Sequence, residues 1–116
     1  MYGTNKQIQW ATDVVARVNS FSNRVSTIRE VIEDSEANNE YKNKLIDITD
    51  KIFKRVQYIN NEADAGAIIN WYGYIGLEKV AGKRKYNESL EKFLGDILDD
   101  NEAKYIGELM KIDKMI

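Results

Sequence analysis

The chain has 116 residues, of which 43% are hydrophobic and 31% are charged, and its net charge is −2 from 17 basic and 19 acidic residues. This length suits one domain spanning residues 1–116, and the apolar fraction is too high for a disordered chain. Because the sequence has no cysteine and no histidine, it excludes disulfides, thiol nucleophiles, cysteine-bound zinc and imidazole chemistry.

The absence of proline is typical of a chain that is mostly helix with short connections. A dedicated nucleic-acid binder usually has a strong excess of basic residues, so the charge does not favour that class. No run approaches the roughly 18 apolar residues of a membrane span. Residues 1–6 lack the apolar stretch of a signal peptide. We therefore expect a cytoplasmic protein with no membrane association.

The first predicted helix covers residues 5–34. Thr4 and Gln7 have the spacing of a capping box at its start. Apolar residues then alternate at spacings of three and four, which is a heptad seam: Ala11, Val14, Val18, Phe21, Val25, Ile28 and Ile32. Such a seam can be covered within one bundle or by a second chain. The sequence leaves both open, and a homodimer is the form that we favour.

A polar segment over residues 34–39 separates this helix from a second one. The second helix carries its own apolar stripe, made of Tyr41, Leu45, Ile48, Ile52, Val56 and Ile59. Short polar connections between long amphipathic helices indicate antiparallel neighbours. The sequence thus predicts an all-α fold, a small bundle of two long antiparallel helices plus two or three shorter ones. Phe21 and Ile52 should both lie in its core.

The second half of the chain predicts shorter elements. Residues 62–72 read as a helix with Ala63, Ala67, Ile68 and Trp71 along one side, and Gly73 reads as its C-cap. Residues 73–86 are left open between helix and loop. Two short helices follow. The first has Asn87 as its cap and the stripe Leu90, Phe93, Leu94 and Ile97, and the second has Asn101 as its cap and the stripe Ala103, Ile106, Leu109 and Met110.

Motifs for chemistry are weak. The acidic residues Asp96, Asp99, Asp100 and Glu102 lack the spacing of a Ca²⁺ loop and read better as a helix end and an acidic N-cap. Residues 73–76 match a bare GXXG, which a helix C-cap explains better. A pair of catalytic carboxylates is the remaining enzymatic alternative, and nothing in the sequence singles one out. We therefore predict no catalytic residues, no metal, no cofactor and no enzymatic activity.

Residues 71–85 form the most atypical segment. It combines three aromatic residues, Trp71, Tyr72 and Tyr74, with a basic cluster of Lys79, Lys83, Arg84 and Lys85. A helical bundle does not need this combination, so we predict that these seven residues contact a partner. Aromatic side chains would anchor a protein, whereas the basic cluster would contact nucleic-acid phosphates. Whether Trp10 and Trp71 lie in the core or at the surface stays open.

The segment Lys6-Gln7-Ile8-Gln9-Trp10-Ala11 resembles the "KQI-x-WA" opening of a group of small helical proteins from Firmicutes, their phages and mobile elements. In that group a later segment often reads "A-x-x-W-I-D-N-R". Residues 65–72 are similar in place but lack the closing Asp-Asn-Arg. The resemblance carries over no functional residue and implies a phage or mobile-element protein.

Small acidic phage proteins without catalytic residues often inhibit host machinery stoichiometrically, CRISPR systems included. Our leading hypothesis is therefore a non-catalytic protein-binding protein that inhibits a host defence system. The alternative is a small nucleic-acid-binding accessory protein or regulator.

Overall fold

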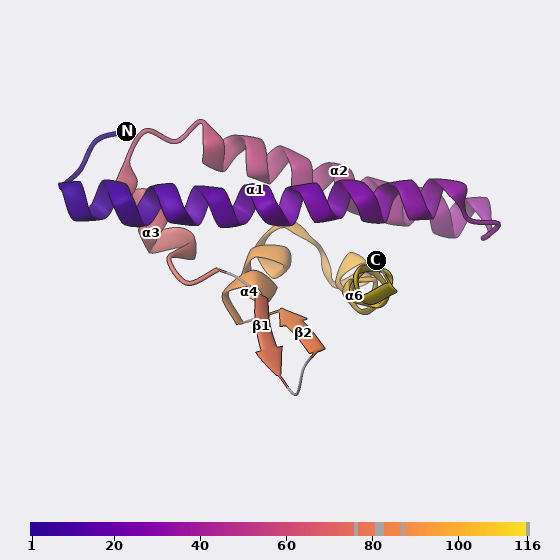
Figure 1. Ribbon diagram of the computed structural model, residues 1–116. Helices are drawn as coiled ribbons and strands as arrows, with labels where there is room; N and C mark the ends of the chain where they lie inside the picture. The colour runs from indigo at the N-terminus through magenta and orange to yellow at the C-terminus, as the bar shows by residue number, and fades with distance from the viewer. Residues whose placement is uncertain (76, 81–82, 87, 116) are drawn as a thin grey trace.

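The computed structural model describes residues 1–75, 77–80, 83–86 and 88–115, with the side chains of 77–80 and 83–86 left out. Two long helices, α1 (Asn5–Asp34) and α2 (Asn39–Asn60), lie antiparallel along most of their lengths (Figure 1). The remaining elements lie on one side of this pair (Figure 1): α3 (Ala65–Tyr72), β1 (Leu77–Val80), β2 (Lys83–Tyr86), α4 (Glu88–Ile97), α5 (Asp100–Ala103) and α6 (Ile106–Met115). The predicted helical bundle with two long antiparallel helices is confirmed, and the strand pair is the one departure from an all-α fold in the described residues.

The start of α1 and its buried face follow the sequence pattern. The backbone N–H of Gln7 donates to Thr4 Oγ1 at 3.1 Å, and that of Thr4 donates to Gln7 Oε1 at 2.9 Å, which completes the capping box. The seven residues of the heptad seam are the buried residues of α1, and Phe21 and Ile52 both lie in the core as expected. Since other elements of the same chain cover this seam, a homodimer, which stays a prediction, would need a different surface.

Helix α3 begins three residues later than predicted. The N-terminal segment pairs with the chain just before α3: Tyr2 N–H donates to the carbonyl of Ala63 at 2.8 Å, and Ala65 N–H donates to the carbonyl of Tyr2 at 3.0 Å. This pairing keeps residues 63 and 64 outside the helix, and Asp64 caps α3 by accepting from Gly66 N–H. The predicted apolar side is correct only in part, because Ile68 is buried but Ala67 and Trp71 are half-buried and Ala63 is exposed. The buried residues of α3 are Ala65, Ile68 and Tyr72.

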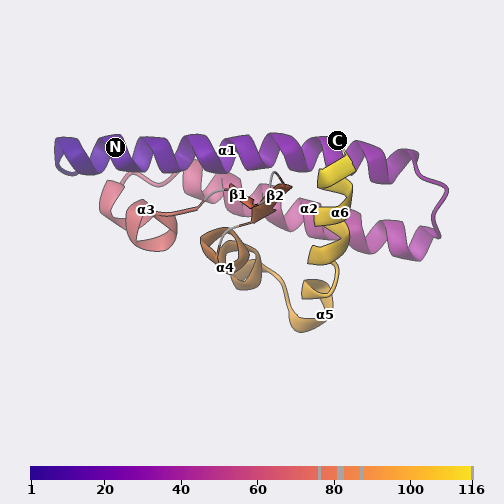
Figure 2. The same ribbon diagram turned by 60° about the horizontal axis from the view of Figure 1, so that its bottom comes forward.

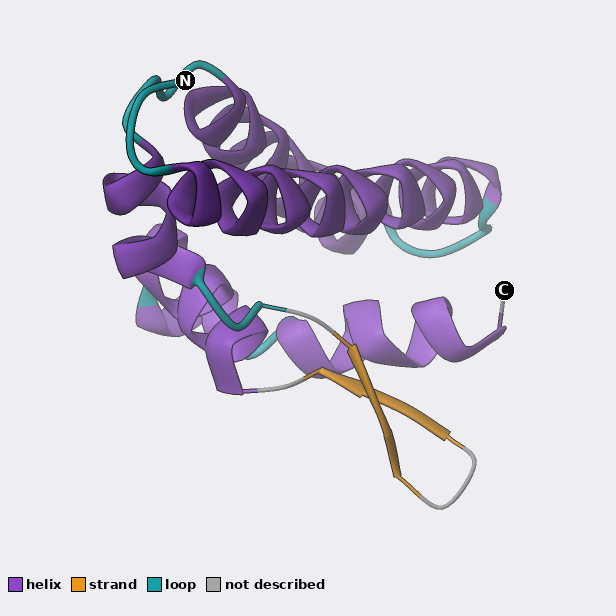
Figure 3. Cartoon of the chain, turned by 60° about the vertical axis from the view of Figure 1, so that its left-hand side comes forward, coloured by secondary structure: helices purple, strands orange, loops and turns teal. Residues whose placement is uncertain are grey.

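Residues 77–86 contain an antiparallel pair of strands, where the sequence left helix and loop as the choices. Leu77 pairs with Tyr86 and Val80 with Lys83. The pair projects away from the helices (Figure 3). Neither strand sequence, LEKV or KRKY, alternates polar and apolar residues, which is the pattern by which strands are recognised in a sequence.

The C-terminal helices turn back onto the long pair, and α6 lies across α1 (Figure 2). Leu90, Phe93 and Leu94 are buried as predicted, whereas Asn87 lies outside the described residues. Asn101 is not the cap of the last helix. Asp99 accepts from the N–H of Glu102 and starts the short helix α5 instead. None of the helices in the described part is both long enough and apolar enough to cross a membrane.

Candidate functional site

The three aromatic residues predicted to form one surface are distributed around α3. Tyr72 is buried, with only 4% of its surface exposed, and its ring packs edge-on against Phe93 at 5.1 Å between centroids. Trp71 is half-buried and lies beside Tyr58 of α2. Tyr74 is 74% exposed and contacts Trp10 of α1 instead. The structure therefore presents two separate aromatic surfaces.

The first surface, which we call the aromatic knob, consists of Trp10 and Tyr74. Their ring centroids are 5.6 Å apart, in an edge-on arrangement. The indole N–H of Trp10 donates to the carbonyl of Gly73 at 2.8 Å, which fixes the Trp10 ring although 39% of it is exposed. Trp10 is thus held by a hydrogen bond within the fold, and its ring is the surface that the exposed Tyr74 ring contacts.

Gly73 is required by this packing. Its backbone is right-handed helical, with φ of −55°, so a positive φ is not the reason for glycine here. A Cβ atom at this position would lie 2.7 Å from the carbonyl oxygen of Ile69 and 3.2 Å from the Trp10 ring. Residue 73 must therefore lack a side chain for the Trp10 indole to reach the carbonyl of residue 73.

Gly73→Ala should therefore lower the free energy of unfolding by about 1–3 kcal/mol, since the added methyl group forces backbone or Trp10 to shift. Gly95→Ala is the matched control. It lies within α4, and a Cβ there would have nothing within 4 Å, so it should stabilise by about 0.5–1 kcal/mol through helix propensity. Urea denaturation measures both. Equal effects of the same sign would show that Gly73 has no packing role.

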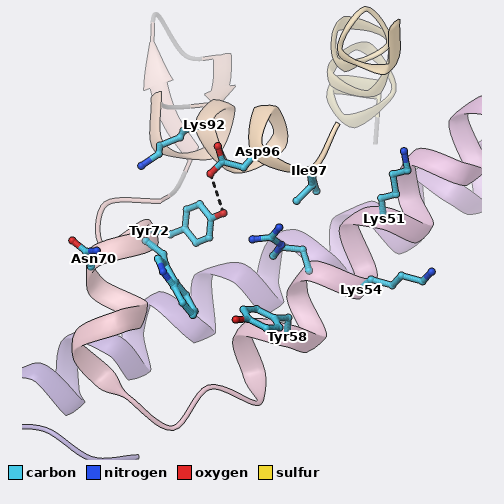
Figure 4. A pocket seen from close by; sticks show the side chains of 10 residues that line it. Lys51, Lys54, Tyr58, Asn70, Tyr72, Lys92, Asp96 and Ile97 are labelled. Atoms are coloured by element: carbon cyan, nitrogen blue, oxygen red, sulfur yellow. Dashed lines mark hydrogen bonds between the residues drawn. The ribbon is translucent and has the colours of Figure 1, made fainter. Parts of the chain in front are cut away.

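The second surface is a groove of about 770 Å³ between α2, α3 and α4, which we call the basic groove (Figure 4). One side carries Lys51, Lys54 and Tyr58 from α2, and the other carries Lys92, Asp96 and Ile97 from α4. Arg55 of α2 and residues 70–72 of α3 complete the lining. The lining therefore contains four cations, one carboxylate and three aromatic rings.

Three of the groove's polar residues are engaged within the fold. The Tyr72 hydroxyl donates to Asp96 Oδ2 at 3.3 Å. Burial raises the pKa of Tyr72, and the positive charge of Arg55 opposes that rise, so the phenol stays a neutral donor at physiological pH. Lys51 forms an ion pair with Glu102, whose hydrogen bond raises the pKa of Lys51.

Sequence reasoning identified Trp71 and Tyr72 but missed the other residues of the basic groove. Lys51, Lys54 and Arg55 are on the polar side of α2, where charges usually indicate a solvated face. Lys92 and Asp96 lie 20 or more residues further along the chain than Trp71. Only the packing of α4 beside α2 and α3 brings them together.

The predicted basic cluster lies on the strand pair. Lys79 is directly opposite Arg84, Lys83 is opposite Val80 and Lys85 is opposite Glu78. Alternate residues of a strand fall on opposite faces, so the register divides the four basic residues between the two faces. Their side chains lie outside the described part, and their role in binding stays a prediction.

Of the four acidic residues near the end of α4, Asp99 is an N-cap, as predicted, whereas Asp96 accepts a hydrogen bond from Tyr72 in the groove. Asp99 accepts from the N–H of Glu102 at 2.8 Å, and this backbone hydrogen bond lowers the pKa of Asp99. No group of three or more residues that could hold a metal ion occurs within the described ranges.

Comparisons with protein-family models, with curated proteins and with solved structures found no match to this chain. Structural arguments about the function must therefore come from the aromatic knob and the basic groove.

Proposed function

We propose that this is a non-catalytic protein-binding protein and that its partner contacts the aromatic knob. The observation that carries the proposal is the geometry of Tyr74. Three quarters of its surface is exposed, yet its ring rests on Trp10, which is itself hydrogen-bonded to Gly73. A large aromatic side chain held rigidly at the surface loses little entropy on binding, and tryptophan and tyrosine dominate the energetics of protein interfaces.

The chain segment beside the knob supports a protein partner. Strand β1 begins two residues after Ile75 and starts the strand pair that holds Lys79, Lys83, Arg84 and Lys85. Basic residues at the rim of an interface speed association with an acidic partner, and salt weakens this effect. We therefore expect the partner to cover Tyr74 and to extend toward the strand pair.

The resemblance to phage and mobile-element proteins adds the class of partner. In this proposal the protein acts in the cytoplasm of a bacterial host, where it binds a component of a defence system, of the CRISPR type for example, and inhibits it by occupying its surface. Inhibition of this kind needs one molecule of inhibitor per target and no catalytic group.

Tyr74→Ala is expected to weaken partner binding by about 30-fold or more, which corresponds to the roughly 2 kcal/mol of an interface hot spot. The test immobilises the wild-type protein, Tyr74→Ala and Tyr58→Ala and compares what each recovers from a nuclease-treated bacterial lysate by quantitative mass spectrometry. Tyr58 is the matched control because it is also an exposed tyrosine, at 55%, but lies in the basic groove.

The proposal requires a protein that the wild type and Tyr58→Ala recover in equal amounts and that Tyr74→Ala loses. Recovery of the same proteins by all three would show that the aromatic knob is not the binding surface. Loss in Tyr58→Ala alone would move the protein interface to the basic groove.

A further inference from the structure

The basic groove has a chemistry that the aromatic knob lacks. We propose that it binds a short stretch of single-stranded nucleic acid, with phosphates on its lysine and arginine side chains and a base on its aromatic rings. This site lies apart from the knob, so the inference does not depend on the proposed protein partner.

The groove's positive charge is largely uncompensated. Lys54, Arg55 and Lys92 form no ion pair with any carboxylate in the described ranges of the chain, whereas Lys51 is paired with Glu102. The whole chain has a net charge of −2, so this concentration of cations is local. Lysines from α2 and α4 lie on opposite sides of the groove with their ammonium groups at its outer edge (Figure 4), where the phosphates of a strand crossing the groove would contact them.

The aromatic residues supply a surface for a base. Tyr58 is 55% exposed, and its ring lies 5.6 Å from that of Trp71 with 33° between the planes. The guanidinium of Arg55 is 5.7 Å from the centre of the Tyr58 ring. Aromatic rings and arginine beside cations are the usual elements of single-strand binding. Asn70 and Asp96 add hydrogen-bonding groups of the kind that contact base edges.

An acidic peptide matches the charge of the groove but not its lining. A peptide bound in a groove gains most of its affinity from aliphatic or aromatic anchors in an apolar floor. Ile97 is the one aliphatic residue of this lining, and the centre holds the hydrogen bond from Tyr72 to Asp96. The flat aromatic rings of the groove, with polar groups beside them, can stack with a base, and every nucleotide of a single strand has an unstacked base available. In a duplex the bases are already stacked on each other.

The test measures the fluorescence anisotropy of a labelled eight-nucleotide thymidine oligonucleotide titrated with the full-length protein at low salt. We expect saturable binding whose log affinity falls with log salt at a slope of about −2, because three cations neutralise about three phosphates at roughly 0.7 each on a single strand. Lys54→Gln/Lys92→Gln should abolish most of the binding. Lys6→Gln/Lys114→Gln changes the net charge equally at exposed positions of α1 and α6 and should leave affinity unchanged.

Tyr58→Ala tests the stacking at constant charge. Loss of the Tyr58 ring should lower the affinity for the oligonucleotide by about fivefold or more. Tyr74→Ala should leave this affinity unchanged. No binding at about 50 mM salt, or equal weakening by both pairs of lysine substitutions, would overturn the proposal. Two further outcomes would overturn the proposal by assigning the groove to a different ligand. One is equal affinity for a duplex, and the other is tighter binding of a glutamate- and leucine-rich peptide or of ATP.

Discussion

Replacing Phe93 by alanine is expected to lower the free energy of unfolding by about 3–5 kcal/mol, the range for truncating a fully buried phenylalanine. Phe93 has no exposed surface. Its ring packs edge-on against Phe21 at 6.2 Å and against Tyr72 at 5.1 Å between centroids. These contacts join α4 to α1 and α3, so the cavity would open where three helices meet.

The loss is large relative to the total stability of a domain of this size, which is about 5–15 kcal/mol. Urea denaturation monitored by circular dichroism measures it. Phe53→Ala is the control. Because Phe53 of α2 is only partly buried, its substitution should lower the free energy of unfolding by less. If Phe93→Ala and Phe53→Ala lost the same small amount, α4 would not be packed against the long helices as described, and the basic groove would lose one of its walls.

The two long helices were predictable because their information is local. A seam of seven apolar residues at spacings of three and four specifies one face of a helix wherever the helix ends up. The capping box at Thr4 and Gln7 specifies where α1 begins, because both of its hydrogen bonds form between residues three apart. Neither signal needs a contact from a distant part of the chain.

Predictions for α3 failed where a distant contact intervenes. Tyr2 pairs with Ala63 and Ala65, and this pairing holds the chain extended where the apolar pattern predicted the start of a helix. The later start goes with a different buried face, in which Tyr72 lies inside and Trp71 lies at the groove. No sequence pattern within residues 62–72 indicates where α3 begins or which face it buries.

Both candidate surfaces depend on contacts that no sequence spacing shows. The hydrogen bond from Trp10 to Gly73 joins residues 63 positions apart, and the basic groove needs α2, α3 and α4 together. The sequence nevertheless indicated the right region for the knob, because four of the five residues from Trp71 to Ile75 have large apolar side chains, which cannot all face inward. Exposure of Tyr74 is the consequence.

The second large effect concerns the ion pair that ties α6 to α1. Arg24 Nε donates to Asp113 Oδ1 at 2.7 Å, and the Arg24 guanidinium also donates to the backbone carbonyl of Asp113 at 3.2 Å. The Asp113 side chain is only 5% exposed and that of Arg24 is 24% exposed. Arg24→Met would leave the buried carboxylate without this cation, so we expect a loss of about 2–4 kcal/mol in the free energy of unfolding.

A double substitution shows whether the lost free energy of unfolding comes from leaving the buried Asp113 carboxylate without its cation. Arg24→Met/Asp113→Leu removes both charges and should recover part of the stability that Arg24→Met loses, because apolar residues can replace a buried ion pair at little cost. Lys111→Met is the surface control. Lys111 pairs with Glu108 at 3.7 Å with 75% of its side chain exposed, so its loss should cost less than about 1 kcal/mol. Removing the cation from a buried carboxylate should lower the free energy of unfolding more than removing it from an exposed one. If Arg24→Met and Lys111→Met lowered the free energy of unfolding equally, the contact between Arg24 and Asp113 would not hold α6 on α1.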